Sequence, residues 1–204
     1  MIKLGVTGGI GSGKSVVCEV LRLHGIPVFD ADREAKKLNE TSPVIREKLI
    51  NNFGPDLYLN DRLDRKKLAS LIFNNKENLR TTNAIIHPEL AKHFVKWADQ
   101  RKHYAVVAID AAVLFEAGFQ SLLDKTIIVL APLETRIERA VKRDHLSKEQ
   151  VMARASSQMK DEEKARLADF TIHNDGRHSL LEQVTNPTRG FNPLLIPDFR
   201  ETCL

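Results

Sequence analysis

The sequence has little cysteine and no long apolar run. Its 204 residues include only two cysteines, Cys18 and Cys203. Two thiols are too few for a disulfide framework or a four-thiolate zinc site, and we expect both to stay reduced. The strongly apolar stretches, such as 104–109 and 126–131, fall far short of the roughly 20 residues that a membrane helix needs. Glycines interrupt the first apolar residues, so we predict no signal peptide and expect a cytoplasmic protein.

The net charge is also small. The chain has 31 basic and 27 acidic residues and a net charge of +4, which suits an anionic small molecule as well as nucleic acid. It has no basic run interleaved with aromatic residues, so nucleic-acid binding is disfavoured. A hydrophobic share of 42% excludes a disordered chain, and the length favours one domain with a small insertion.

Short apolar runs rich in β-branched residues recur between longer helical patterns. They cover residues 2–6, 26–29, 104–110, 125–130 and 170–172. Unbroken apolar runs are typical of strands buried on both faces, and helices between them favour a parallel sheet. The sequence therefore predicts an α/β fold. After the first strand, an apolar stripe over 16–23 predicts a helix, with Gly25 at its C-terminal cap.

The second and third predicted strands are separated by about seventy residues, too many for one crossover helix. The apolar spacing in this segment is helical, so we predict a helical subdomain that holds a second substrate. His87-Pro88 is interpreted there as the end of one helix and the start of the next. Residues 132–168 form a further helical stretch with few large apolar side chains in its middle, which favours a mobile flap over core.

A glycine-rich loop follows the first predicted strand. Residues 8–15, Gly8-Gly9-Ile10-Gly11-Ser12-Gly13-Lys14-Ser15, match G-x-x-x-x-G-K-[ST] between a strand and a helix. Glycines let N–H groups point at phosphate oxygens, and the helix N-terminus favours the same anion. Lys14 is expected to reach the β- and γ-phosphates and the Ser15 hydroxyl to ligate Mg²⁺, so the loop predicts ATP or GTP with magnesium. It lacks G-x-G-x-x-G, which disfavours a dinucleotide site.

Four carboxylates follow predicted strands. Asp30 and Asp32 come after the second strand, at the edge where open α/β sheets bind ligands. Either one is the base that accepts the proton of an attacking hydroxyl, or they only cap a helix, and the sequence favours neither interpretation. Asp110 ends the third strand, where a carboxylate holds magnesium or is a plain strand terminus. Glu116 ranks below these and is equally an ordinary loop acid.

Three arginines, Arg136, Arg139 and Arg143, are spaced so that a helix places them on one face. Guanidinium groups suit phosphate, which favours an anion site there. The alternative is that they pair on a solvated helix with the neighbouring acids Glu134, Glu138 and Asp144. The last predicted strand ends in the turn residues His173-Asn174-Asp175-Gly176, where a loop could contact an adenine edge.

Taken together, these residues resemble the dephospho-CoA kinase family, whose members phosphorylate the ribose 3′-hydroxyl of dephospho-CoA in the last step of coenzyme A synthesis. The resemblance covers residues 2–184. It rests on residues 7–15, Asp30-Ala31-Asp32, His87-Pro88, Leu114-Phe115-Glu116, Arg139, Arg143-Asp144, Gln158 and residues 168–176. The sequence departs from the family at Ala112, where proline is usual, and after Val184, where a helix usually continues.

The resemblance implies a P-loop NTPase fold similar to nucleoside-monophosphate kinases, with a parallel five-stranded sheet flanked by helices, a helical acceptor insertion and a helical lid. The nucleotide-binding core would comprise residues 1–32 and 104–184, with the lid at about 140–165. The acceptor domain would be 33–103. Residues 185–204 stay unassigned.

The resemblance also implies roles for single residues. Asp32 would be the general base, and Lys14 and Arg143 would stabilise the transferred phosphoryl group. Ser15 and Asp110 would hold magnesium, and Asp32, His87, Pro88 and Glu116 would lie on the side of the dephospho-CoA substrate. The nucleotide would be bound by Gly8, Gly9, Gly11, Ser12, Gly13, Lys14, Ser15, Val16, Arg139, Asn174 and Gly176.

The cofactors expected are ATP and Mg²⁺, and the partner is a small molecule rather than nucleic acid or a membrane, with the protein a monomer or weak homo-oligomer. Two other functions compete. A kinase for another small acceptor would differ in the acceptor domain. A GTP-dependent switch is disfavoured because the sequence has neither N-K-x-D nor D-x-x-G.

Overall fold

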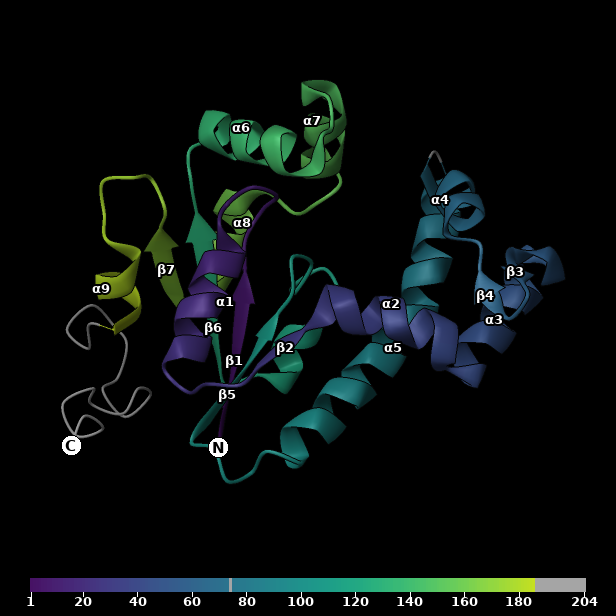
Figure 1. Cartoon of the computed structure of the whole chain (residues 1–204), viewed down its shortest axis with the longest axis horizontal. Coiled ribbons are helices and arrows are strands. Elements are labelled where there is room, and N and C mark those ends of the chain that lie inside the picture. Colours follow the sequence, from purple (N-terminus) through teal and green to yellow (C-terminus); the bar gives the residue numbers. More distant parts are fainter. Residues whose placement is uncertain (74, 186–204) are drawn as a thin grey trace. The chain divides into compact units, whose positions relative to one another are not determined.

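The protein is described by a computed structural model that covers residues 1–73 and 75–185 (Figure 1). The chain divides into two compact units. Unit 1 comprises Met1–Phe29 and the chain from Ala98 onward, and unit 2 comprises Asp30–Trp97. These boundaries lie close to those that the resemblance implies, and the roles of the two units stay predictions.

Unit 1 is built on a five-stranded parallel sheet in the order β2-β5-β1-β6-β7. The strands are β1 (Ile2–Thr7), β2 (Val28–Asp30), β5 (Val106–Asp110), β6 (Lys125–Leu130) and β7 (Phe170–His173). The predicted α/β class and parallel sheet are therefore confirmed. β2 starts later than predicted because Pro27 has no N–H for the ladder, although its carbonyl accepts from Ala108 at 2.8 Å. β5 also starts later, because Tyr104 closes a turn by donating to the Arg101 carbonyl.

Helices connect and follow the strands of unit 1. These are α1 (Lys14–Leu23), η2 (Phe119–Leu122), α6 (Leu133–Asp144), α7 (Lys148–Ser156), α8 (Asp161–Leu167) and α9 (Leu180–Thr185). On one face, Leu4 and Val6 of β1 join a buried cluster with Val17 and Leu21 of α1. The alternate residue Gly5 lies on the other face, where a Cβ would meet Leu114 and Leu123. Both faces are thus buried, which explains why the strands are apolar without alternation.

The predicted flap has a small core of its own. Ile137 and Ala140 of α6 and Val151 of α7 form a buried cluster, against which Ile10 of the glycine-rich loop packs. The predicted single stretch is three helices, and the capping box of Ser147 and Gln150 starts the second. Motion of this segment stays a prediction.

Unit 2 is helical, as its spacing predicted, but it also contains a hairpin. Its elements are α2 (Ala31–Thr41), α3 (Pro43–Phe53), η1 (Pro55–Leu57), β3 (Tyr58–Leu59), β4 (Arg62–Leu63), α4 (Arg65–Phe73) and α5 (Lys76–Asp99), the last ending in unit 1. The hairpin turns at Asn60 and Asp61, both with positive φ. These two residue types tolerate the left-handed region, which a two-residue hairpin loop needs. The hairpin was not predicted, because strands of only two residues leave no pattern in the sequence.

The predicted helix boundary at His87-Pro88 is wrong. Pro88 lies inside the 24-residue helix α5. Proline lacks an N–H donor and costs roughly 3 kcal/mol or more within a helix. Packing outweighs this cost, because Ile85 and Ile86 just before it join the buried cluster of unit 2 around Ile45, Leu49 and Leu57.

Among the residues described, none of the helices is long and apolar enough to cross a membrane. Thr185 ends α9, whereas the rest of the unassigned segment 185–204, and Cys203 with it, lies outside the described residues.

Candidate functional site

The glycine-rich loop joins β1 to α1, as predicted. Gly11 and Gly13 have positive φ values of 75° and 87°, and the Ser12 N–H donates to the Gly9 carbonyl at 3.0 Å. Gly13 is the N-cap of α1, where no side chain caps the helix and the first turn holds no acid. No side chain of the helix therefore competes with an anion at this N-terminus, where the helix dipole favours negative charge.

The loop glycines are also needed for packing. A Cβ at Gly9 would overlap the Arg136 guanidinium, and one at Gly11 would overlap the Arg136 backbone. A Cβ at Gly13 would overlap the side-chain amide of Asn174. The glycine-rich motif alone indicates only close approach to phosphate, because the segments that pack on the loop are determined by the tertiary fold.

Lys14 and Asp110 meet beside the loop. The Lys14 ammonium forms an ion pair with the Asp110 carboxylate, and both side chains are largely buried. Asp110 lies opposite Val6 in the β1–β5 register, one residue before β1 ends. The structure thus places the predicted metal-binding carboxylate next to the predicted phosphate-binding lysine.

The residues around the loop suit magnesium and phosphate. Ser15 and Asp110 offer oxygen ligands, which Mg²⁺ prefers, and Mg²⁺ commonly takes its remaining ligands from phosphates and water. No cluster of three or more His, Cys, Asp or Glu occurs in the part of the chain that the structure describes, so a cage made only of protein is not formed there. Within the same residues, the buried Ser12 hydroxyl has no hydrogen-bond partner, as expected of a group that meets a ligand.

The three arginines of α6 have three different environments. Arg136 is buried, pairs with Asp161 and donates from Nε to the Ile10 carbonyl at 2.9 Å. Arg139 donates to the Asn174 carbonyl at 3.4 Å. Arg143 is exposed and binds Asp144 through two hydrogen bonds of 2.8 and 2.9 Å.

Of the two interpretations of this arginine face, the ion-pair interpretation applies to Arg143, and the anion site stays a prediction. Arg143 pairs with Asp144, as the ion-pair alternative expected, and this pairing lowers the pKa of Asp144. Arg136 instead takes a partner, Asp161, that lies 25 residues further along the chain. Burial raises the pKa of Asp161, and the charges of Arg136 and Lys164 offset only part of this effect.

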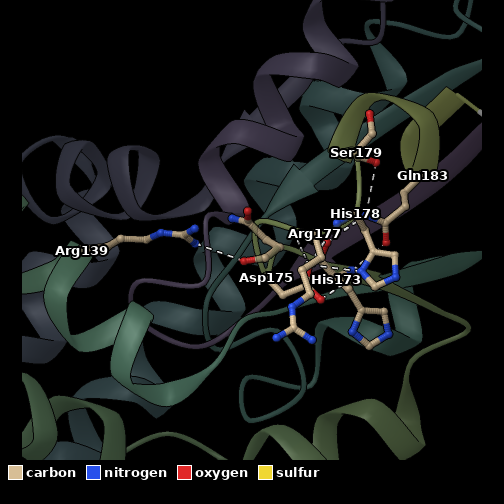
Figure 2. A network of polar contacts seen from close by, with 8 residues as sticks. Arg139, His173, Asp175, Arg177, His178, Ser179 and Gln183 are labelled. Carbon is tan, nitrogen blue, oxygen red and sulfur yellow. Dashed lines mark hydrogen bonds and ion pairs between the residues drawn. The ribbon is translucent and has the colours of Figure 1, made fainter.

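The loop after β7 reaches the glycine-rich loop. The Asn174 side-chain amide donates to the Ser12 carbonyl at 2.8 Å. Figure 2 shows Arg139 reaching toward this loop, and Asp175 facing His178. Asp175 accepts from the Arg177 and His178 N–H groups at 2.9 and 3.1 Å. The structure therefore brings Arg139 and Asn174, which the resemblance places beside the adenine, into one network.

Gln183 fixes the start of that loop. Its side chain accepts from the His173 N–H and donates to the His173 carbonyl, both at 2.8 Å (Figure 2). The hydrogen bonds from Arg177, His178 and the His178 ring lower the pKa of Asp175 to about 2.

Glu116 lies in a network that the sequence did not reveal. Its carboxylate accepts from the Met159 N–H at 2.8 Å and pairs with Lys164 at 2.9 Å. Lys164 is fully buried and also donates to the Ala112 carbonyl at 2.7 Å, which the Thr7 hydroxyl approaches at 3.3 Å. A lysine in a charged helix gives no sequence signal for such burial, because exposed lysines are the rule.

The remaining predicted residues belong to unit 2 and are described within it. Asp30 is the N-cap of α2 and accepts from the Arg33 N–H at 2.9 Å, so the capping interpretation holds for Asp30. Asp32 lies in the first turn of α2 with its side chain exposed. His87, partly buried, and Pro88, exposed, lie in the middle of α5.

Comparison with known proteins gives consistent results. A family model described as dephospho-CoA kinase matches residues 2–179. The dephospho-CoA kinase of Porphyromonas gingivalis is 46% identical over 185 residues, covering 90% of this chain and 91% of that protein. A solved structure from Thermus thermophilus aligns with a TM-score of 0.80 at 37% identity, covering 92% of this chain and 95% of the other. For dephospho-CoA kinase from Campylobacter jejuni the TM-score is 0.64 at 29% identity, with coverage of 89% and 92%.

Proposed function

The chain belongs to the dephospho-CoA kinase family, which catalyses the final ATP-dependent step of coenzyme A biosynthesis, and from that premise we propose how its own residues transfer a phosphoryl group from ATP to the ribose 3′-hydroxyl of dephospho-CoA. The observation that carries the proposal is the glycine-rich loop with Lys14 paired to Asp110 at its edge. A strand, a loop of N–H groups and an uncapped helix N-terminus form a site for the phosphates of ATP.

Asp32 is the general base. It follows the carboxyl end of β2 by two residues and is exposed, whereas Asp30 is occupied as a helix cap. A carboxylate in this position accepts the proton of the 3′-hydroxyl as that oxygen attacks the γ-phosphorus. The proton is then on the Asp32 carboxylate, and the γ-phosphoryl group is on the 3′ oxygen of the acceptor. ADP leaves with the electron pair of the broken bond between the γ-phosphorus and the bridging oxygen.

Lys14 and Arg143 stabilise the charge of the transferred group. Lys14 turns from Asp110 toward the β- and γ-phosphates, and Arg143 exchanges Asp144 for phosphoryl oxygens, to which its planar fork is well matched. Gly8, Gly9, Gly11, Ser12, Gly13, Ser15 and Val16 line the phosphates, mainly through backbone N–H groups. Arg139, Asn174 and Gly176 flank the adenine.

Ser15 and Asp110 hold magnesium, to which both offer oxygen ligands. When bound, the metal neutralises negative charge on the phosphates. Asp110 pairs with Lys14 in this structure, and its carboxylate would offer oxygen ligands to the metal.

Unit 2 binds the acceptor, and residues of about 140–165 form the lid that excludes water from the reaction. His87, Pro88 and Glu116 contact dephospho-CoA, the last through the carboxylate oxygen that Lys164 does not occupy. The reaction needs neither nucleic acid nor a membrane. A cytoplasmic monomer or weak homo-oligomer is sufficient for it, since the cytoplasm supplies ATP.

Two neighbouring aspartates provide a matched test of the base. Asp32→Asn should lower kcat by about 10² or more and leave the Kd of ATP within twofold, because proton transfer to a positioned base is typically worth that much. Asp30→Asn should keep near-normal kcat, because asparagine caps helices as well as aspartate does. Steady-state rates with dephospho-CoA and ATP titrations measure both. Near-normal turnover in Asp32→Asn, or an equal loss in both variants, would rule out Asp32 as the base.

A further inference from the structure

Ile10, at the tip of the glycine-rich loop, is held in three ways by the segment 133–167. Its side chain packs against the buried cluster of α6 and α7. Its N–H donates to the Gln158 side chain at 3.3 Å, and its carbonyl accepts from Arg136 Nε at 2.9 Å. Both backbone polar groups of Ile10 are therefore bound to side chains of that segment.

Arg136 differs from the other arginines of α6. It is 7% exposed, and its guanidinium is divided between the Ile10 carbonyl and Asp161. Its neighbours Gly9 and Gly11 leave no room for a Cβ, so it lies directly against the loop. A buried guanidinium is expensive in free energy unless its hydrogen bonds are satisfied. The Arg136 guanidinium therefore binds the loop backbone and Asp161, and we do not assign it to phosphate binding.

The bond to the Ile10 carbonyl also orients a second group. A trans peptide is planar, and its C=O and N–H point in opposite directions. The plane that carries the Ile10 carbonyl also carries the Gly11 N–H, which must point away from Arg136. Gly9 and Gly11 flank Ile10, and glycine has easy access to backbone conformations that other residues avoid. Without an anchor, this plane can rotate and present a carbonyl oxygen where an N–H would otherwise point.

We propose that Arg136, kept in place by Asp161, is a positioning residue that fixes the Ile10–Gly11 peptide and so holds the loop in the conformation that binds nucleotide phosphates. The inference rests on the proposed function, in which this loop binds ATP. It assigns Arg136 a task distinct from those of Arg139 and Arg143. Arg136 touches no reacting atom and acts only through the backbone of the loop.

The test replaces Arg136 and its partner one at a time. Arg136→Met keeps the apolar stem and removes every donor, Arg136→Lys restores the charge without the fork, and Asp161→Asn keeps the arginine but removes its counter-charge. Glu138→Gln, on the exposed side of the same helix, is the matched control. Calorimetry gives the Kd of ATP and ADP in the absence of acceptor, rates give the KM of each substrate, and circular dichroism confirms folding.

Arg136→Met should weaken ATP and ADP binding about tenfold, the value of one hydrogen bond to a charged group, with the KM of dephospho-CoA within twofold. Arg136→Lys should recover part of the loss, Asp161→Asn should weaken binding about threefold, and the control should change nothing. Unchanged Kd in a folded Arg136→Met, or an equal rise in both KM values, would overturn the inference. If Arg136→Met does not fold, Asp161→Asn decides, and an unchanged Kd there also overturns it. Wild-type protein that binds no ATP would instead refute the proposed function.

Discussion

The glycine-rich loop and unit 2 are fixed in place by different kinds of contact. Side chains that bind its backbone hold the loop: Arg136 and Gln158 at Ile10, and Asn174 at Ser12. An apolar cluster around Ile45 and Leu49 holds unit 2 together, and its ion pair of Arg65 with Glu40 lies on the surface.

Because the contacts differ, substitutions around the loop and in unit 2 should have different effects. Polar contacts to a flexible, glycine-rich backbone depend on direction, so losing one changes the shape of the site. Apolar packing tolerates changes at the surface. Polar substitutions around the loop should therefore alter nucleotide binding and stability together, while substitutions of exposed side chains in unit 2 should leave ATP binding and stability nearly unchanged.

The largest effect on stability is expected at Lys164. Lys164→Met should cost about 2–4 kcal/mol of unfolding free energy, because it leaves the Glu116 carboxylate without its counter-charge and the Ala112 carbonyl without a donor. The matching change in unit 2, Arg65→Met, should cost less than about 1 kcal/mol, since both partners there are exposed. Urea denaturation measures both. Equal losses would contradict the distinction between the two regions.

An intermediate effect is expected at His87 in unit 2. His87→Ala should raise the KM of dephospho-CoA about tenfold and leave the KM of ATP within twofold, since one lost hydrogen bond to a charged group is worth about that much. Lys92→Ala, an exposed residue of the same helix, is the control. Initial rates at varied concentrations of each substrate give the two values. A rise in the KM of ATP as large as that of the acceptor would place His87 on the nucleotide side.

The smallest effect concerns the loop after β7, which supports the glycine-rich loop through Asn174. Asp175 has a pKa of about 2 because the Arg177 N–H, and then the N–H and ring of His178, hydrogen-bond its carboxylate. A pKa that folding lowers contributes stability that is complete above 3.8, the ordinary value, and is lost as pH falls through about 2.

The change in the amide chemical shifts of Arg177 and His178 that reports protonation of Asp175 should therefore be absent from pH 7 down to about 4 and appear only toward pH 2. Asp175→Asn should remove the change at low pH. A midpoint near 3.8 in the wild-type protein would show that these bonds do not form in solution.

The sequence predicted the strands well because their signal is local. Residues 125–130 form an apolar β-branched run, and β6 has these bounds. The phosphate loop was predicted for the same reason, since its glycines, lysine and serine are contiguous. Local signals failed where tertiary packing decides, as at Pro88, where the buried residues Ile85 and Ile86 help to carry one helix through a proline.

The environments of the charged residues could not be predicted. Spacing placed Arg136, Arg139 and Arg143 on one helix face but did not say which counter-charge each would take. Asp161 lies far from Arg136 in sequence, and only the folding of α8 against the sheet brings it near. Lys164 was missed for a similar reason, because its burial follows from contacts to Ala112 and Glu116 that precede it by about fifty residues.

The most direct test of the account is the product of the reaction. Purified protein is incubated with ATP and Mg²⁺ and with dephospho-CoA, AMP, another nucleotide or no acceptor, and ADP release and product mass are recorded. We predict ADP release that depends on dephospho-CoA, with coenzyme A as the product and the added phosphate at the ribose 3′ position. ADP release with another acceptor in preference to dephospho-CoA, or at the same rate with no acceptor, would contradict the account.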